Sequence, residues 1–141
     1  MKHVLVLLLC SLLPGCALFR RPPRPVHAPP EEAAQVQFPL GLPEQERQII
    51  RGNILRAVQL AMDDFLPWDT RPHEGASPLE LCLYRREAYD AITAPGPEGI
   101  IFVSIVPSPH ECDFGSAPVL DLGATYAIDV RGWRILAIQG Q

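Results

Sequence analysis

The residues able to do chemistry in this 141-residue chain are four cysteines, four histidines and sixteen acidic side chains. Two groups have the composition of metal ligands, the pair His73–Glu74 and the run from His110 to Asp113. Metal sites usually draw on spacings such as C-x-x-C or H-x-x-x-H, and neither occurs in the sequence. We therefore expect no metal and no cofactor, and interpret both histidines as ordinary loop residues.

Acid–base catalysis needs carboxylates, or a His–Asp pair, that converge in a cleft. Nothing in the spacing of the aspartates indicates such convergence, although they could pair in space: Asp63, Asp64, Asp69, Asp121 and Asp129. Sequence signatures of a nucleophile elbow, a phosphate loop or a nucleotide-binding fingerprint are absent. The expectation is a protein without catalytic residues, and not an enzyme.

The charge of the chain argues against nucleic acid as a partner. From Pro43 onward, eight arginines stand against fourteen acidic side chains, which gives a net charge near −6. Affinity for nucleic acid comes from basic side chains that neutralise phosphates. A chain with this balance is a poor candidate for that class of ligand.

The first 15 residues have the layout of a signal peptide. Lys2 supplies a positive charge, and Val4 to Leu13 form an apolar run of ten residues. This run is too short to cross a bilayer, which takes about 20 apolar residues. The pattern predicts that residues 1–15 direct export and are removed, with a buried N-terminal core helix as the alternative.

The four residues that end this segment, Leu13-Pro14-Gly15-Cys16, resemble the lipobox of bacterial lipoproteins. Leu13, Gly15 and Cys16 match the pattern, whereas Pro14 replaces the usual Ala or Ser. The resemblance implies cleavage before Cys16 and attachment of acyl chains such as palmitate to Cys16, which together anchor a protein stably to a membrane. Ala17, in place of Asp, implies sorting to the outer membrane, facing the periplasm. An ordinary signal-peptidase site is the alternative interpretation.

Two cysteines, Cys82 and Cys112, remain once Cys10 is removed with the signal peptide and Cys16 is lipidated. Paired cysteines in an exported domain favour a disulfide. Such a bridge would close a loop of about 30 residues and add roughly 3–4 kcal/mol in the chain-entropy model. Free thiols, or a metal site that uses Cys112, are the alternatives.

Residues 16–42 are predicted to be a lipidated cysteine followed by a disordered tether. Seven of the sixteen prolines lie between Pro22 and Pro43, and proline-rich chain is extended and packs poorly. We expect a spacer that lifts the domain off the membrane, with a polyproline recognition motif as the sharper alternative. Residues 43–141 then form the globular domain.

Hydrophobic periodicity predicts one long helix and about four strands in this domain. Apolar residues recur at helical spacing over 43–66, where Pro43 suits the first turn and Pro67 ends the helix. Alternation or continuous apolarity predicts strands at 79–84, 100–106, 120–130 and 133–139. Turns are expected at 95–99 and at Arg131-Gly132.

This order predicts an α+β fold in which the long N-terminal helix packs on an antiparallel sheet of about four strands. It looks like the cystatin-like or NTF2-like arrangement. The segment from Ala124 to Leu136 is similar to the closing hairpin of PepSY-type and NTF2-like immunity domains, because it contains Tyr126, Asp129, a turn glycine and an Ile-Leu pair.

Three function classes follow. The preferred one is a non-catalytic envelope lipoprotein whose domain binds a protein partner, of which an immunity-type inhibitor of a periplasm-directed toxin is a special case. The second is a small-ligand carrier, which an apolar cavity lined by Met62, Phe65 and Phe102 would favour. The third is an enzyme, which would need two carboxylates or a His–Asp pair to meet in a cleft.

Overall fold

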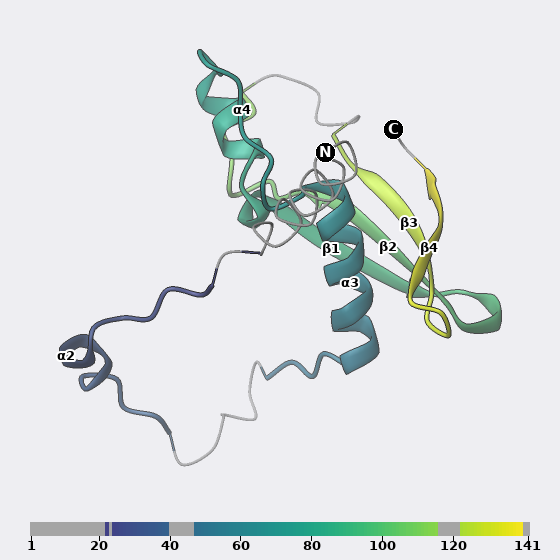
Figure 1. The fold of residues 1–141 in the computed structure, drawn as a ribbon, viewed down its shortest axis with the longest axis horizontal. Coiled ribbons are helices and arrows are strands. Elements are labelled where there is room, and N and C mark those ends of the chain that lie inside the picture. The colour runs from purple at the N-terminus through teal and green to yellow at the C-terminus, as the bar shows by residue number, and fades with distance from the viewer. Residues whose placement is uncertain (1–21, 23, 40–46, 116–121, 140–141) are drawn as a thin grey trace, which may run out of the picture. The chain divides into compact units, whose positions relative to one another are not determined.

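The computed structural model describes residue 22 and residues 24–39, 47–115 and 122–139 (Figure 1). The chain divides into two compact units, Met1–Phe38 and Pro39–Gln141. In the first unit the described residues contain one short helix, α2 (Pro30–Ala33), which starts at a proline and buries no side chain. The side chains around it are exposed, including Val26 and Phe38.

The second unit contains a four-stranded antiparallel sheet in the order β1-β2-β3-β4. The strands are β1 (Tyr89–Pro95), β2 (Ile100–Pro107), β3 (Ala124–Asp129) and β4 (Arg134–Gln139). Each strand pairs with the next in the chain, so the sheet is a meander. The α+β class and the antiparallel four-stranded sheet predicted from the sequence are therefore confirmed.

One helix, α3 (Gly52–Phe65), crosses a face of this sheet (Figure 1). Its buried residues Ala57 and Ala61 have no solvent exposure, because these small side chains let the helix approach the strands closely. The core beneath them comes from alternate residues of the two central strands: Ile101, Val103, Ile105, Ala124, Tyr126 and Ile128. This period-2 burial is the pattern of a sheet with one covered face.

The predicted helix over 43–66 is too long at its N-terminal end. Residues 47–51 are not helical, and residues 40–46 lie outside the described part of the chain. Arg51 is the N-cap and makes no side-chain capping bond. Most helical stability in proteins comes from packing of an apolar face. Ile49 and Ile50 are 83% and 62% exposed, so no packing extends the helix upstream of Gly52.

The predicted strand over 79–84 is wrong, because this segment forms the helix α4 (Pro78–Leu83). The Ser77 Oγ accepts a hydrogen bond from the Glu80 backbone N–H at 3.2 Å, and the Glu80 carboxylate accepts one from the Ser77 N–H at 2.7 Å. This reciprocal capping box starts a helix. The fourth strand is instead β1, which follows a short 3₁₀ turn, η2 (Arg86–Ala88).

The turns predicted between strands are present. A 3₁₀ turn, η3 (Pro97–Gly99), connects β1 to β2, and Gly99 adopts a φ of +84° that side-chain-bearing residues rarely tolerate. Residues 130–133 connect β3 to β4. Strand β3 begins at Ala124 and not at Leu120, which lies outside the described residues. Strand β2 passes close to Gly123. A Cβ on residue 123 would lie 2.5 Å from the Ile105 carbonyl oxygen, so a side chain does not fit at this position.

Candidate functional site

Cys82 and Cys112 form a disulfide, as the sequence predicts, with their Cα atoms 5.9 Å apart. Cys82 lies on α4, and not mid-way along a strand, while Cys112 lies in the turn after β2. The Ser108 N–H donates a hydrogen bond to the Ala88 carbonyl at 2.8 Å. That bond holds the end of β2 beside the start of β1, which brings the turn within reach of α4.

Around the disulfide, polar contacts fix α4 in place. The Tyr89 hydroxyl donates to the Leu83 carbonyl at the end of the helix at 2.9 Å. The pKa of Glu80 lies below its ordinary value, chiefly because the Ser77 N–H donates to its carboxylate. The Arg85 guanidinium lies 3.0 Å from the Cys82 sulfur. Tyr89, Glu80 and Arg85 thus all make contacts within α4 or at its ends.

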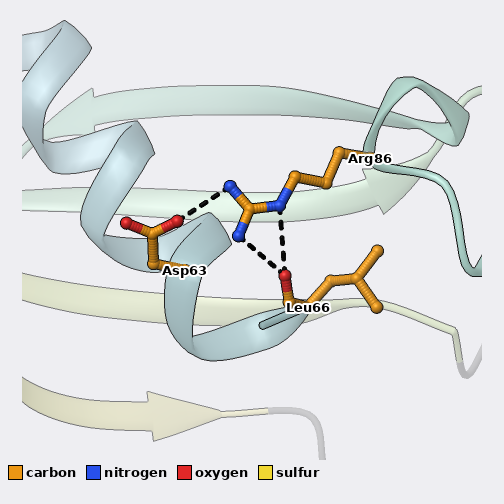
Figure 2. A network of polar contacts seen from close by, with 3 residues as sticks. All are labelled: Asp63, Leu66 and Arg86. Carbon is orange, nitrogen blue, oxygen red and sulfur yellow. Dashed lines mark hydrogen bonds and ion pairs between the residues drawn. The ribbon is translucent and has the colours of Figure 1, made fainter. Parts of the chain in front are cut away.

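The C-terminal end of α3 carries a polar network centred on Arg86 (Figure 2). The guanidinium donates two hydrogen bonds to the Leu66 carbonyl, from Nε at 3.1 Å and Nη2 at 2.9 Å. Its third nitrogen forms an ion pair with Asp63 at 2.8 Å. A carbonyl at a helix C-terminus lacks an intrahelical donor, and a cation there offsets the negative end of the helix dipole. Asp63 therefore helps to hold Arg86 at the C-terminal end of α3.

The other predicted carboxylates take different positions. Asp129 accepts a hydrogen bond from the Arg131 N–H at 2.9 Å and pairs with Arg134 at 3.3 Å. These contacts, led by the Arg131 bond, hold the pKa of Asp129 below its ordinary value. Asp69 is exposed, and Asp121 lies outside the described residues. Asp63 and Asp129 each form an ion pair with an arginine, Arg86 and Arg134 respectively.

The predicted loop histidines, His73 and His110, are exposed. Within residues 22, 24–39, 47–115 and 122–139, no three metal-binding side chains gather into a candidate site. Cys16, the predicted lipid-attachment residue, lies outside these ranges. No helix in the described part of the chain is long and apolar enough to cross a membrane.

Tyr126 is fully buried beneath α3, and its hydroxyl has no hydrogen-bond partner among the described residues. Burial raises the pKa of Tyr126 to about 12, and the Asp64 carboxylate on α3 adds to the shift. Tyr89 packs edge-on against Phe65 with ring centroids 5.0 Å apart. Both tyrosines therefore pack between α3 and the sheet.

An apolar cavity lined by Met62, Phe65 and Phe102 does not form, and the sheet geometry explains why. Met62 and Phe65 pack against the core on the α3 side of the sheet. Phe102 lies between Ile101 and Val103, both of which face α3. Successive side chains of a strand point to opposite faces, so Phe102 lies on the other side of the sheet.

A groove of 460 Å³ is instead present where α3 begins. One wall comes from the residues that precede and open the helix, and the other from the end of β1 and the start of β2. The apolar lining residues are Ile49, Ile50, Ile54, Ala94, Pro95 and Ile101, and the polar ones are Arg51, Asn53 and Thr93. Although Ile49 and Ile50 line the groove, most of each side chain is exposed.

The sequence prediction missed this groove, because the helix that it placed over 43–66 includes Ile49 and Ile50. The shorter helix leaves Ile49 and Ile50 outside the core, with apolar side chains in contact with solvent. Arg51 and the backbone N–H groups of the first helical turn, which no side chain of the N-cap residue caps, contribute positive charge to this end of the groove. The surface thus combines apolar walls with a positive charge in an otherwise acidic domain.

Comparison with protein-family models, curated proteins and solved structures finds no match to this chain.

Proposed function

We propose that this chain is an exported bacterial lipoprotein, anchored through acyl chains on Cys16 to the outer membrane on its periplasmic side. In this proposal, the domain is a non-catalytic module that binds another protein of the envelope. The observation that supports export is the Cys82–Cys112 disulfide. Disulfides form and persist in oxidising compartments and are rare in the cytosol.

The groove at the start of α3 supports the binding role. Ile49 and Ile50 stand 83% and 62% exposed beside an apolar wall made by Pro95 and Ile101. Apolar side chains exposed together, with a charged residue at their border, are typical of protein interaction sites. Arg51 favours a partner segment that carries acidic residues next to its apolar ones. The partner is therefore an envelope protein with an exposed apolar and acidic segment.

The binding role is tested by photo-crosslinking from the groove in intact envelopes. A benzophenone amino acid at Ile49 should give a discrete adduct with a second protein. In this background, Ile50→Asp should abolish the adduct, whereas Leu55→Asp should leave it intact. Leu55 is a matched control, because it is 58% exposed on α3 and does not line the groove. Equal adduct yield in the two variants would contradict binding through the groove.

A small-ligand carrier is the second candidate, and the size of the groove favours it. Its 460 Å³ falls in the range of about 300–1,000 Å³ typical of ligand pockets. An apolar ligand with an anionic group would match Ile49, Ile50 and Arg51. Native mass spectrometry of the envelope-purified protein separates the two candidates, since a carrier retains a small molecule that Ile50→Asp releases.

An immunity-type inhibitor of a periplasm-directed toxin is the narrower form of the protein-binding proposal. It rests on the similarity of the Ala124–Leu136 hairpin to such domains and on the cystatin-like or NTF2-like order of elements. The β3–β4 pairing is consistent with this hairpin. If the crosslinked partner is a secreted toxin, this narrower form holds. If the partner is a resident envelope protein, only the broader proposal holds.

A further inference from the structure

The charged side chains of the domain are divided between its two ends. At one end lie the start of α3, the turn η3 and the turn between β3 and β4 (Figure 1). Among the described residues, this end carries two carboxylates, Glu98 and Asp129, and five arginines: Arg47, Arg51, Arg56, Arg131 and Arg134. We call this set the basic end, and its net charge is +3.

The opposite end of the domain has the reverse charge. It comprises the C-terminal end of α3, the loop after it, α4, η2, the start of β1 and the turn after β2. The remaining nine carboxylates and three arginines of residues 47–115 and 122–139 lie there, which gives a net charge of −6. The two ends are about 20 Å apart, since α3 has 14 residues that each rise about 1.5 Å.

This separation lets a charged surface sense one end of the domain at a time. The Debye length is about 8 Å at physiological ionic strength, so charges about 20 Å away are largely screened. An anionic surface therefore attracts the basic end, although the domain as a whole is acidic. A basic side chain near an anionic membrane contributes about fivefold to binding. The net charge of the basic end thus gives roughly a hundredfold preference for this orientation.

The side chains of the basic end are accessible to such a surface. All five arginines are exposed. Arg134 pairs with Asp129, yet its side chain remains 71% exposed. Beside the arginines stand Ile49 and Ile50, which are 83% and 62% exposed. Basic and apolar side chains together are typical of protein surfaces that lie at a membrane interface. This composition matches anionic lipid headgroups.

We propose that the basic end faces an anionic lipid surface, the membrane that holds the anchor. This inference rests on the proposed lipid anchor at Cys16, which keeps the domain near the membrane and leaves charge to select its orientation. It also narrows the proposed partner. The groove at the start of α3 opens at the basic end, so its partner is a protein whose apolar and acidic segment lies at the membrane surface.

The two tryptophans of the chain report this orientation, because they lie at opposite ends of the domain. Trp133 ends the turn between β3 and β4, where the Arg56 guanidinium lies 4.1 Å from its ring centroid, and Trp68 follows α3. Full-length lipidated protein that carries Trp68→Phe or Trp133→Phe is added to preformed vesicles containing a lipid with a dansyl-labelled headgroup. In vesicles of phosphatidylglycerol and phosphatidylcholine, energy transfer to dansyl from Trp133 should be several times that from Trp68. In phosphatidylcholine alone, the two should be equal.

Two charge reversals serve as matched variants. Arg131→Glu at the basic end should reduce the excess transfer from Trp133, whereas Arg71→Glu at the opposite end should retain it. Both are exposed arginines that donate to a backbone carbonyl, Arg131 to that of Glu98 and Arg71 to that of Trp68. Neither of them lines the groove. Circular dichroism verifies that both variants fold.

Equal transfer from the two tryptophans in the presence of phosphatidylglycerol would overturn the proposal, as would the same effect of both charge reversals. Equal transfer is the result expected if the basic end serves an acidic protein instead, because these vesicles hold no other protein. Protein that does not float with the vesicles would refute the anchor and the orientation together. Protein that floats but shows equal transfer would refute the orientation alone, and the Ile49 adduct tests protein binding separately.

Discussion

Arg86 donates two hydrogen bonds to the carbonyl oxygen of Leu66, the C-cap residue of α3. The two residues belong to different elements, 20 positions apart in the chain. This contact ties the helix that covers the sheet to the turn that leads into β1. The ion pair to Asp63 is at the surface, with 35% and 48% of the two side chains exposed, and exposed pairs contribute little. The hydrogen bonds to Leu66 should therefore dominate.

We predict that Arg86→Ala lowers the free energy of unfolding by about 1–3 kcal/mol, the usual value of charge-assisted hydrogen bonds. Asp63→Asn removes the ion pair and leaves the bonds to Leu66, so it should cost less than about 0.5 kcal/mol. Urea denaturation followed by circular dichroism measures both values. Equal losses in the two variants would assign the stabilisation to the ion pair instead.

The buried hydroxyl of Tyr126 gives a second prediction. The Asp64 carboxylate is near enough to raise its pKa, but no group of the described residues reaches hydrogen-bonding geometry with it. An unmet buried polar group costs about 1–3 kcal/mol. Tyr126→Phe keeps the ring and removes the hydroxyl, so it should raise the free energy of unfolding by about 1 kcal/mol at neutral pH. Thermal denaturation checks this result. A loss of stability would indicate a polar partner for the hydroxyl.

Tyr126 also predicts how the free energy of unfolding depends on pH in the alkaline range. The pKa of Tyr126 is raised by burial from 10 in the unfolded chain to about 12 in the folded protein. The free energy of unfolding therefore does not depend on the titration of this group below pH 10, and it falls as pH rises from 10 through 12, because the unfolded chain loses the proton first. In Tyr126→Phe this part of the pH dependence should disappear. Denaturation curves between pH 9 and 12 compare the two proteins.

Sequence patterns predict the sheet more accurately than the helices, and particular residues show the physical reasons. The segment 100–106 is apolar on both faces and forms β2, one of the two central strands. The segment 79–84 was misread because Leu79, Leu81 and Leu83 alternate like a strand. The deciding signal was local, since Ser77 and Glu80 form a capping box and Pro78 suits the first helical turn.

The groove could not be predicted, because it depends on where α3 starts. Pro43 and the acidic residues after it satisfy the rules for a helix N-terminus, yet the helix begins at Gly52 without a side-chain cap. Tertiary packing decided that boundary, and it left Ile49 and Ile50 to line a groove. The disulfide was predictable from composition, because the proposed export and lipidation leave Cys82 and Cys112 as the pair of cysteines that can form a bridge.

The proposed anchor gives a fourth prediction. Cys16→Ser removes the thiol that would carry the diacylglyceryl group, so labelled palmitate should no longer enter the protein. The variant should accumulate as an uncleaved or soluble form, which gel mobility and membrane fractionation detect. Ser11→Ala, inside the apolar run, serves as a control that should retain labelling. Palmitate incorporation in the Cys16→Ser protein would refute the lipoprotein proposal.

The last prediction concerns the disulfide between Cys82 and Cys112. The bridge joins α4 to the turn after β2 across a sequence separation of 30 residues. In the chain-entropy model, closing such a loop stabilises the folded state by roughly 3–4 kcal/mol, because it restricts the unfolded chain. Local contacts around it, such as the bond from Tyr89 to Leu83, do not close a long loop. Cys82→Ser should therefore lower the free energy of unfolding by about 2–4 kcal/mol.

The double variant Cys82→Ser, Cys112→Ser is the control, because removal of the second cysteine breaks no further bond. Its stability should equal that of Cys82→Ser within about 0.5 kcal/mol. Protein purified from the envelope should show no free thiol when titrated under denaturing conditions, since Cys16 is alkylated and Cys10 removed in the proposed mature form. Two titratable thiols, together with an unchanged stability of Cys82→Ser, would mean that the bridge does not form in the cell. The support that the disulfide gives to export would then be lost as well.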